Sequence, residues 1–169
     1  MALFNLLDLR ARLRPGQRLI GLDPGAKRVG VALSDALLML ASPRPALPRG
    51  KLAAMAAAIR ALAAREDAGG LVVGLPLSLD GAFGPAAQAA KDWAIAVSVA
   101  TGLPAALWDE RLSTAAANRT LIGEADLSRR KRADAVDSAA AAWMLQGALD
   151  ALRHQGPDAG QPPAGGASM

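Results

Sequence analysis

Three groups of carboxylates in this chain stand where they could hold metal ions together. Asp23 ends the apolar run LIGLD, the pair Asp109–Glu110 ends AALWDE, and Asp134 and Asp137 lie near the start of a long Ala-rich segment. Carboxylates crowded at one place repel each other unless a divalent cation neutralises them. Two such ions about 3.5–4 Å apart activate water and stabilise the leaving oxygen in phosphodiester cleavage. The acids therefore indicate metal-dependent hydrolytic chemistry.

The composition excludes the main alternatives to carboxylate chemistry. The 169 residues contain no Cys and one His, His154. Thiolate metal sites and disulfides are excluded, and a His-based zinc site or a Ser-His-Asp triad is disfavoured. Catalysis should depend on carboxylates with a hard, oxygen-preferring ion such as Mg²⁺ or Mn²⁺.

Each acidic group also has a purely structural interpretation. An Asp before Pro-Gly is often a turn residue. Acids in the first turn of a helix stabilise its positive end by about 0.3–1 kcal/mol, and Asp109–Glu110–Arg111 could form a surface ion pair. The functional interpretation depends on all three groups meeting at one edge of one sheet.

Basic residues flank these acids. The net charge is +4, and SRRKR at 128–132 comes directly before the predicted start of the last helix. We expect a basic loop here that binds phosphates through Arg129, Arg130, Lys131 and Arg132, although a solvated loop is the alternative. Lys27, Arg28 and Arg111 lie closer to the acids, and a guanidinium such as that of Arg111 can bind two oxygens at once.

Hydrophobic periodicity predicts an α/β protein. Strands are expected over Arg18–Asp23, Arg28–Ser34, Leu37–Ala41, 71–74 and Ala105–Trp108, and helices over Leu3–Leu13, Lys51–Asp67, Pro85–Thr101, Ser113 or Thr114 to Ile122, and Ala133–Arg153. The first strands are antiparallel because the link between them is short. We expect an N-terminal extension over 1–17, one domain over 18–153 and a disordered Pro/Gly-rich tail over 154–169.

Four segments, in order, resemble the bacterial YqgF/RuvX family: LDPGAKRVGVALSD, VVGLPLSLDGAFGP, WDERLST and VDSAAAAWMLQGALD. This family is described both as Holliday-junction resolvases and as pre-16S rRNA processing nucleases. The resemblance implies an RNase H-like fold, here a mixed five-stranded sheet with helices on both faces. It also implies that Asp23, Glu110 and Asp137 are the catalytic, metal-binding acids. Asp134 is a candidate fourth ligand, as in the last helix of the related RuvC resolvases.

The resemblance favours a hydrolase that processes the 5′ end of pre-16S rRNA during ribosome biogenesis, using two Mg²⁺ or Mn²⁺ ions. Cleavage of four-way DNA junctions is the first alternative, and a non-catalytic RNA-binding factor for ribosome assembly or transcription is the second. An actin- or sugar-kinase-like phosphotransferase is disfavoured because such enzymes need two copies of this unit. A structured nucleic acid is the expected partner of a monomer or homodimer. The sequence has no secretory signal or membrane span, so a cytoplasmic location is expected.

Overall fold

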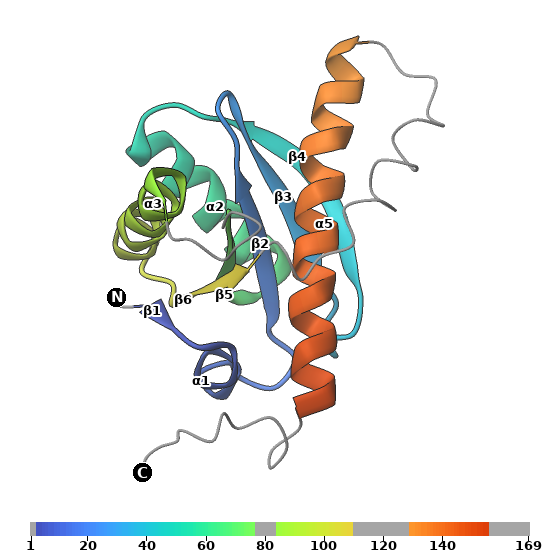
Figure 1. Ribbon diagram of the computed structural model, residues 1–169. Coiled ribbons are helices and arrows are strands. Elements are labelled where there is room, and N and C mark those ends of the chain that lie inside the picture. The colour runs from blue at the N-terminus through green and yellow to red at the C-terminus, as the bar shows by residue number, and fades with distance from the viewer. Residues whose placement is uncertain (1–2, 77–83, 110–128, 156–169) are drawn as a thin grey trace.

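A six-stranded mixed sheet forms the centre of the computed structural model, which describes residues 3–76, 84–109 and 129–155 (Figure 1). The strands are β1 (Leu3–Phe4), β2 (Arg18–Pro24), β3 (Arg28–Ser34), β4 (Ala41–Pro48), β5 (Ala68–Leu75) and β6 (Ala105–Asp109). The helices are α1 (Leu6–Ala11), α2 (Leu52–Glu66), α3 (Pro85–Thr101) and α5 (Arg129–Gln155).

The strand order is β1-β6-β5-β2-β3-β4. β2, β3 and β4 are antiparallel neighbours, whereas β5 pairs in parallel with both β2 and β6. The mixed sheet predicted from the sequence is confirmed, but its strand number was wrong. The sixth strand is β1, in which Leu3 and Phe4 pair with Ala105 and Ala106. The N-terminal segment, expected to be one helix, is therefore a short strand followed by a shorter helix.

The third strand of the chain also differs from its prediction. It was expected over Leu37–Ala41 and to be broken by the following prolines, but β4 begins at Ala41 and continues through Pro43, Pro45 and Pro48. Among the strands of the described residues, β4 lies at the edge of the sheet and pairs on one side only, with β3. A proline there can turn its missing N–H away from the ladder, so edge strands tolerate proline.

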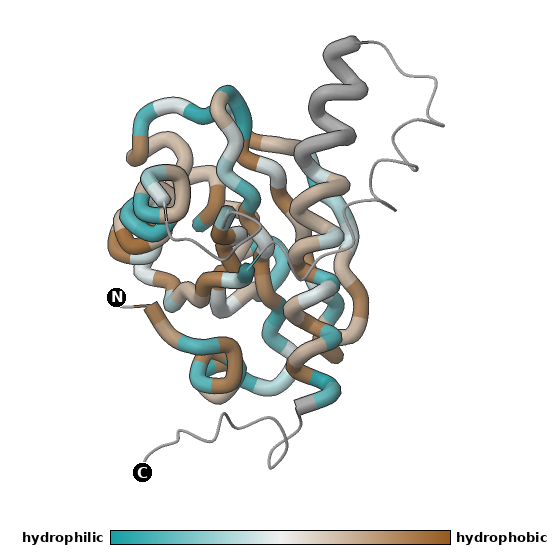
Figure 2. Tube along the Cα trace, in the orientation of Figure 1, coloured by the Kyte–Doolittle hydropathy of each residue, from teal (hydrophilic) through white to brown (hydrophobic). Residues whose placement is uncertain are grey.

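Helices cover both faces of the sheet (Figure 1). On one face α2 and α3 pack against apolar side chains that include Ile20, Leu22 and Val73. On the other face α1 and α5 pack against a second set that includes Leu19, Val72 and Ala106. Figure 2 shows hydrophobic segments along the central strands between these layers. Alternation along each strand thus sends successive side chains to opposite helical layers.

The last helix is longer than the sequence analysis predicted. α5 begins at Arg129 rather than Ala133, so the basic residues expected in a loop belong to its first turns. It ends at Gln155, so His154 and Gln155 are helical rather than part of the tail. The predictions for α2 and α3 are confirmed, and that for α3 has the correct ends. The expected helix near 113–122 and the tail after 155 lie outside the described residues.

None of the helices in the described ranges combines the length and the apolar character needed to cross a membrane.

Candidate active site

Asp23 lies next to the last residue of β2, at the carboxyl end of the parallel part of the sheet. Its neighbour Leu22 packs on the face covered by α2 and α3. Because side chains alternate along a strand, the half-buried Asp23 faces the α5 layer. This is the edge at which ligands bind in open α/β sheets.

Glycines occupy the neighbouring strands at the level of Asp23. On β3, Gly30 is its direct partner. On β5, Gly74 follows Val73, which pairs with Leu22, and therefore stands beside Asp23. Neither neighbouring strand places a side chain next to the carboxylate. Gly74 lies in a segment that the sequence analysis quoted, but no role was assigned to it there.

The Asp23 carboxylate has neither a hydrogen bond nor an ion pair in the part of the chain that the structure describes. Asp35, which follows β3, is different: its Oδ1 accepts hydrogen bonds from the backbone N–H groups of Met39 and Leu40 at 2.7 and 3.1 Å. The turn after Asp23 closes without that carboxylate, since Gly25 N–H donates to the Arg28 carbonyl at 2.9 Å. Asp35 is thus a turn aspartate, whereas Asp23 has no such structural role.

The second predicted acid follows β6 directly. β6 ends at Asp109, which is level with Leu75 at the end of β5. Glu110 itself and Arg111 lie outside the described residues. Since β5 separates β2 from β6, the ends of these two strands are about 10 Å apart, which is twice the spacing of neighbouring strands. The edge of the sheet thus brings Asp23 and the position preceding Glu110 to one region.

Hydrogen bonds fix the position of α5 along the sheet. In its C-terminal half, the Gln146 Oε1 accepts a hydrogen bond from Ala41 N–H at 2.9 Å. Two turns earlier, the Ser138 hydroxyl donates to the carbonyl of Arg44. Arg44 pairs with Val31, and Val31 pairs with Leu22. Ser138 therefore lies against the edge strand β4, level along the sheet with Leu22 near the carboxyl end of β2.

Asp137 directly precedes Ser138 in the helix, so its backbone lies at the level of the Asp23 edge. Asp137 and Asp134 come four residues before Ala141 and Ser138, both of which are buried against the sheet. Residues four apart lie on one side of a helix, so the spacing of Asp134 and Asp137 places both on the same side of α5 as Ser138 and Ala141. The backbone of α5 thus passes the same end of the sheet as Asp23, on the β4 side.

Of the predicted basic residues, Lys27 and Arg28 lie at the same edge. Lys27 is exposed in the turn between β2 and β3, and Arg28 is half-buried. Residues 129–132 form the start of α5, beyond the level of Asp137. The sequence analysis missed Arg49, which follows β4 and donates a hydrogen bond to the Gly25 carbonyl at 2.7 Å. No local pattern marks this arginine, because its place depends on the pairing of β4 with β3.

The donor chemistry at this edge fits a hard divalent cation, because the acids supply only carboxylate oxygens. In the described ranges no three His, Asp or Glu side chains form a group that could hold a metal ion. Glu110 and the side chains of Asp134 and Asp137 lie outside those ranges. His154 belongs to the opposite end of α5, where its Nδ1 contacts the Asp150 carbonyl at 2.7 Å.

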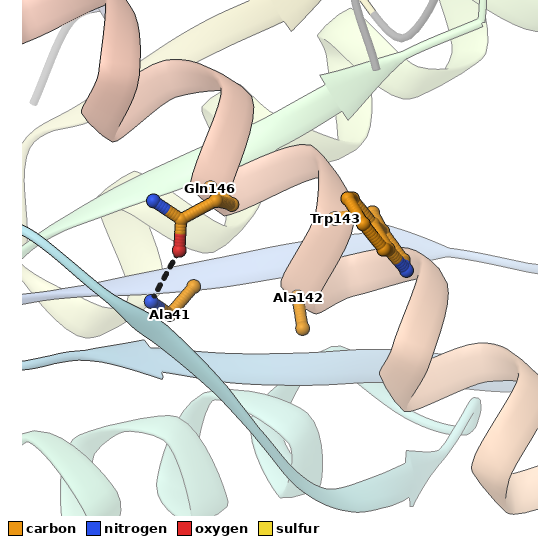
Figure 3. Close-up of a pocket in the computed structure, with 4 residues that line it drawn as sticks. All are labelled: Ala41, Ala142, Trp143 and Gln146. Carbon is orange, nitrogen blue, oxygen red and sulfur yellow. Dashed lines mark hydrogen bonds between the residues drawn. The ribbon is translucent and has the colours of Figure 1, made fainter. Parts of the chain in front are cut away.

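A cavity of about 240 Å³ lies between β4 and α5, away from this edge (Figure 3). Ala41, Ala142, Trp143 and Gln146 line it. Gln146 also donates through Nε2 to the Met39 carbonyl at 2.9 Å, so it joins the turn before β4 to the helix. None of the described residues that line the cavity is ionisable, so they offer nothing for hydrolytic chemistry.

The sheet order, the covering helices and the carboxylate at the strand edge define an RNase H-like α/β protein. A solved structure described as "T. thermophilus RuvC in complex with Holliday junction substrate" has this fold, with a TM-score of 0.51 and 18% sequence identity. The similarity covers 80% of this chain and 94% of that one.

The chain belongs to the RuvX (YqgF) family. The family model described as "RuvX: Holliday junction resolvase" matches residues 17–151. A relative from Gluconacetobacter diazotrophicus, named "Putative pre-16S rRNA nuclease", is 64% identical over 151 residues, which cover 89% of this chain and 98% of the relative. A relative of the same name from Acidiphilium cryptum is 59% identical over 158 residues, which cover 94% of this chain and 99% of the relative. The family predicted from the four sequence segments is confirmed.

Proposed function

We propose that this chain is a metal-dependent endonuclease, a phosphodiester hydrolase that processes the 5′ end of pre-16S rRNA during ribosome biogenesis. The main support is Asp23, a half-buried carboxylate without a described partner at the ligand-binding edge of the sheet. A charge in such a position is costly unless a ligand compensates it. The names of the relatives supply the substrate.

In this proposal Asp23, Glu110 and Asp137 hold two Mg²⁺ or Mn²⁺ ions, with Asp134 as a candidate further ligand. Such ions lower the pKa of bound water and stabilise charge on the leaving oxygen. The protein's own contribution is to orient the carboxylates from two strands and one helix. Lys27, Arg28, Arg111 and the basic residues Arg129, Arg130, Lys131 and Arg132 bind phosphates on either side of the cleaved bond.

Cleavage of four-way DNA junctions is the second candidate, favoured by the description of the matching family model. The same acids would act on the phosphodiester, and a homodimer would be needed to cut two strands together. A monomer suffices for the RNA reaction. A cytoplasmic location follows from the proposed role in rRNA maturation.

The test is a cleavage assay with Mg²⁺ or Mn²⁺ that compares the wild type with Asp23→Asn. A 5′-leader fragment of pre-16S rRNA and a four-way DNA junction are offered separately. We expect metal-dependent cleavage of the RNA, reduced more than about a hundredfold in the variant, because losing a direct ligand should exceed the about 10–100-fold cost of losing an outer partner. Asp92→Asn is the control, since Asp92 is exposed on α3 and accepts a hydrogen bond only from Gln88 in the described residues.

Cleavage of the junction alone would show that the protein is a junction resolvase rather than an rRNA-processing nuclease. Binding of both nucleic acids without cleavage of either would contradict the nuclease and favour a non-catalytic RNA-binding factor. Full activity of Asp23→Asn would show that the active site lies elsewhere.

A further inference from the structure

A small pocket opens at the carboxyl edge of the sheet, on the opposite face from the Asp23 side chain. Its volume is about 220 Å³, and we call it the α3 pocket. It is formed by the turn after β2, the end of β5 and the first turns of α3, through Pro24, Pro76, Arg49, Ala86, Ala89 and Ala90. Pro24 directly follows Asp23, so the pocket and the proposed catalytic carboxylate flank the same carboxyl edge of β2 from opposite faces of the sheet.

The walls of the α3 pocket are mainly apolar and small. Among the described residues, two prolines, four alanines and one glycine line it beside Arg49, and no acidic side chain contributes to the lining. The volume lies below the ~300–1,000 Å³ of pockets that enclose whole small molecules, so the pocket suits a single ring system. A strongly hydrated phosphate would lose water to such walls without receiving enough hydrogen bonds in return.

One fixed cation stands at this pocket. The Arg49 guanidinium donates to the Gly25 carbonyl at 2.7 Å, and the Arg49 backbone N–H donates to the Lys27 carbonyl at 2.9 Å. Arg49 Cζ also lies 5.8 Å from the centre of the Trp93 ring. An exposed arginine is therefore held in one place on the sheet edge, with further N–H donors available for a phosphate.

We propose that the α3 pocket receives one unpaired nucleobase of the strand being cut, while Arg49 binds the adjoining phosphate. This rests on the proposed nuclease function, and it assigns the substrate class: nucleic acid with an unpaired nucleotide beside the cleaved bond. Sequence-selective and structure-selective RNA recognition uses such unpaired bases, which bind against flat side-chain surfaces and guanidinium groups. A fully paired duplex cannot enter, because its bases remain stacked inside the helix.

The test measures binding without turnover, with EDTA in place of the metal. The ligands are a fluorescent RNA hairpin with a single-stranded 5′ extension, a blunt hairpin with the same stem, and a series in which each extension base in turn is removed to leave an abasic site. We expect the wild type to bind the extended hairpin about tenfold more tightly than the blunt one. Removal of one particular base should abolish that preference, as stacking of one base contributes on the order of tenfold.

Two variants with matched controls connect this preference to the pocket. Ala89→Leu fills the pocket while keeping a good helix former, and it should lose the preference and the sensitivity to base removal. Ala57→Leu, an exposed alanine on α2, should keep both. The Arg49→Gln variant should bind the extended hairpin more weakly than the wild type does. Its affinity should still fall when the one particular base is removed. Its control is Arg60→Gln, since Arg60 is also exposed and donates to a main-chain carbonyl, that of Ala100, at 2.6 Å.

Equal affinity of the wild type for both hairpins, or no sensitive base in the series, would overturn the proposal. The proposal would also be overturned if Ala89→Leu, like Ala57→Leu, kept the preference for the extended hairpin and the sensitivity to base removal. Sensitivity to Arg49→Gln with no base dependence would mean a phosphate contact alone and would also overturn it. Failure of the nuclease proposal is distinguishable, because it appears as an absence of cleavage by the wild type in the metal-containing assay and leaves these binding measurements unaffected.

Discussion

At the scale of single residues, Asp23 and Asp35 show that the same type of side chain can have different roles at two strand ends. Both stand near the end of a strand in the antiparallel half of the sheet. The Asp35 carboxylate accepts two backbone hydrogen bonds and so stabilises the fold. Asp23 has no described partner that could repay its partial burial. Of the two, Asp23 is therefore the one suited to binding a ligand.

The role of Asp35 leads to a pH-dependent prediction. Partial burial raises the pKa of Asp35, but hydrogen bonds from the backbone N–H groups of Met39 and Leu40, with the nearby charge of Arg18, lower it by more. The net pKa lies below the ordinary value of about 3.9. The ionised carboxylate thus stabilises the folded state above that pH, and this contribution disappears as the pH falls through the folded-state pKa.

We expect Asp35→Asn to lower the free energy of unfolding by about 1 kcal/mol at pH 7. The difference should shrink below about pH 4, as the wild-type carboxyl also becomes neutral. Urea denaturation at pH 7 and pH 3 measures it, with Asp92→Asn as the control. An equal loss of stability at both pH values would show that the charge of Asp35 contributes nothing.

At the scale of elements, the close packing of α5 on β2 decides where the acids of the helix lie. A Cβ added at Gly21 would lie 2.9 Å from the Leu145 Cβ, so the helix rests directly on the backbone of the strand. Leu145 and Leu149 are fully buried in this contact layer. Because the Leu145 Cβ cannot rotate away, any side chain at position 21 must displace the helix.

Gly21→Ala should therefore destabilise the protein by about 1–3 kcal/mol, the usual cost of overpacking. It should also reduce cleavage, since a displaced α5 moves Asp137 relative to Asp23. Denaturation midpoints and turnover measure the two effects. Gly50→Ala is the control, because an added Cβ there meets nothing within 4 Å. Wild-type stability of Gly21→Ala would mean that α5 does not rest on this strand.

At the scale of the whole molecule, the proposed cleavage edge combines acids with cations from distant parts of the chain. The turn after β2 and the residue after β4 supply Lys27 and Arg49 there, and we propose that the basic residues in the first turns of α5 add to them. Acids that bind metal ions would otherwise repel a polyanion. Surrounding cations let the phosphates approach while the metal ions neutralise the centre.

Replacing Arg129, Arg130, Lys131 and Arg132 together by Gln should weaken RNA binding in a salt-dependent way. Each lost phosphate contact lowers the slope of log affinity against log salt by about 0.7 for a single strand, so the slope should fall by up to about 3. Fluorescence anisotropy over a salt series measures this. Arg65→Gln, on the exposed side of α2, should leave the slope unchanged. An unchanged slope in the fourfold variant would exclude this helix start from the binding surface.

The sequence by itself determined the features that depend on neighbouring residues. The helical spacing of apolar residues predicted both ends of α3, and the apolar runs predicted the positions of β2, β3, β5 and β6. Both signals can be read from the sequence because they arise from local backbone geometry. The absence of Cys limited any metal site to oxygen and imidazole ligands. The four family segments indicated which acids to examine.

Only the tertiary structure decided the features that depend on pairing between distant segments. Two residues, Leu3 and Phe4, are too few to signal a strand, and only their pairing with β6 makes β1. β4 persists through its prolines because it lies at the edge, a position that no local pattern encodes. The level of the Asp137 backbone along the sheet depends on the hydrogen bond between Ser138 and Arg44, and the position of Arg49 depends on its hydrogen bond to Gly25. Local periodicity specifies which face of an element is buried, whereas contacts across the sheet specify what that face meets.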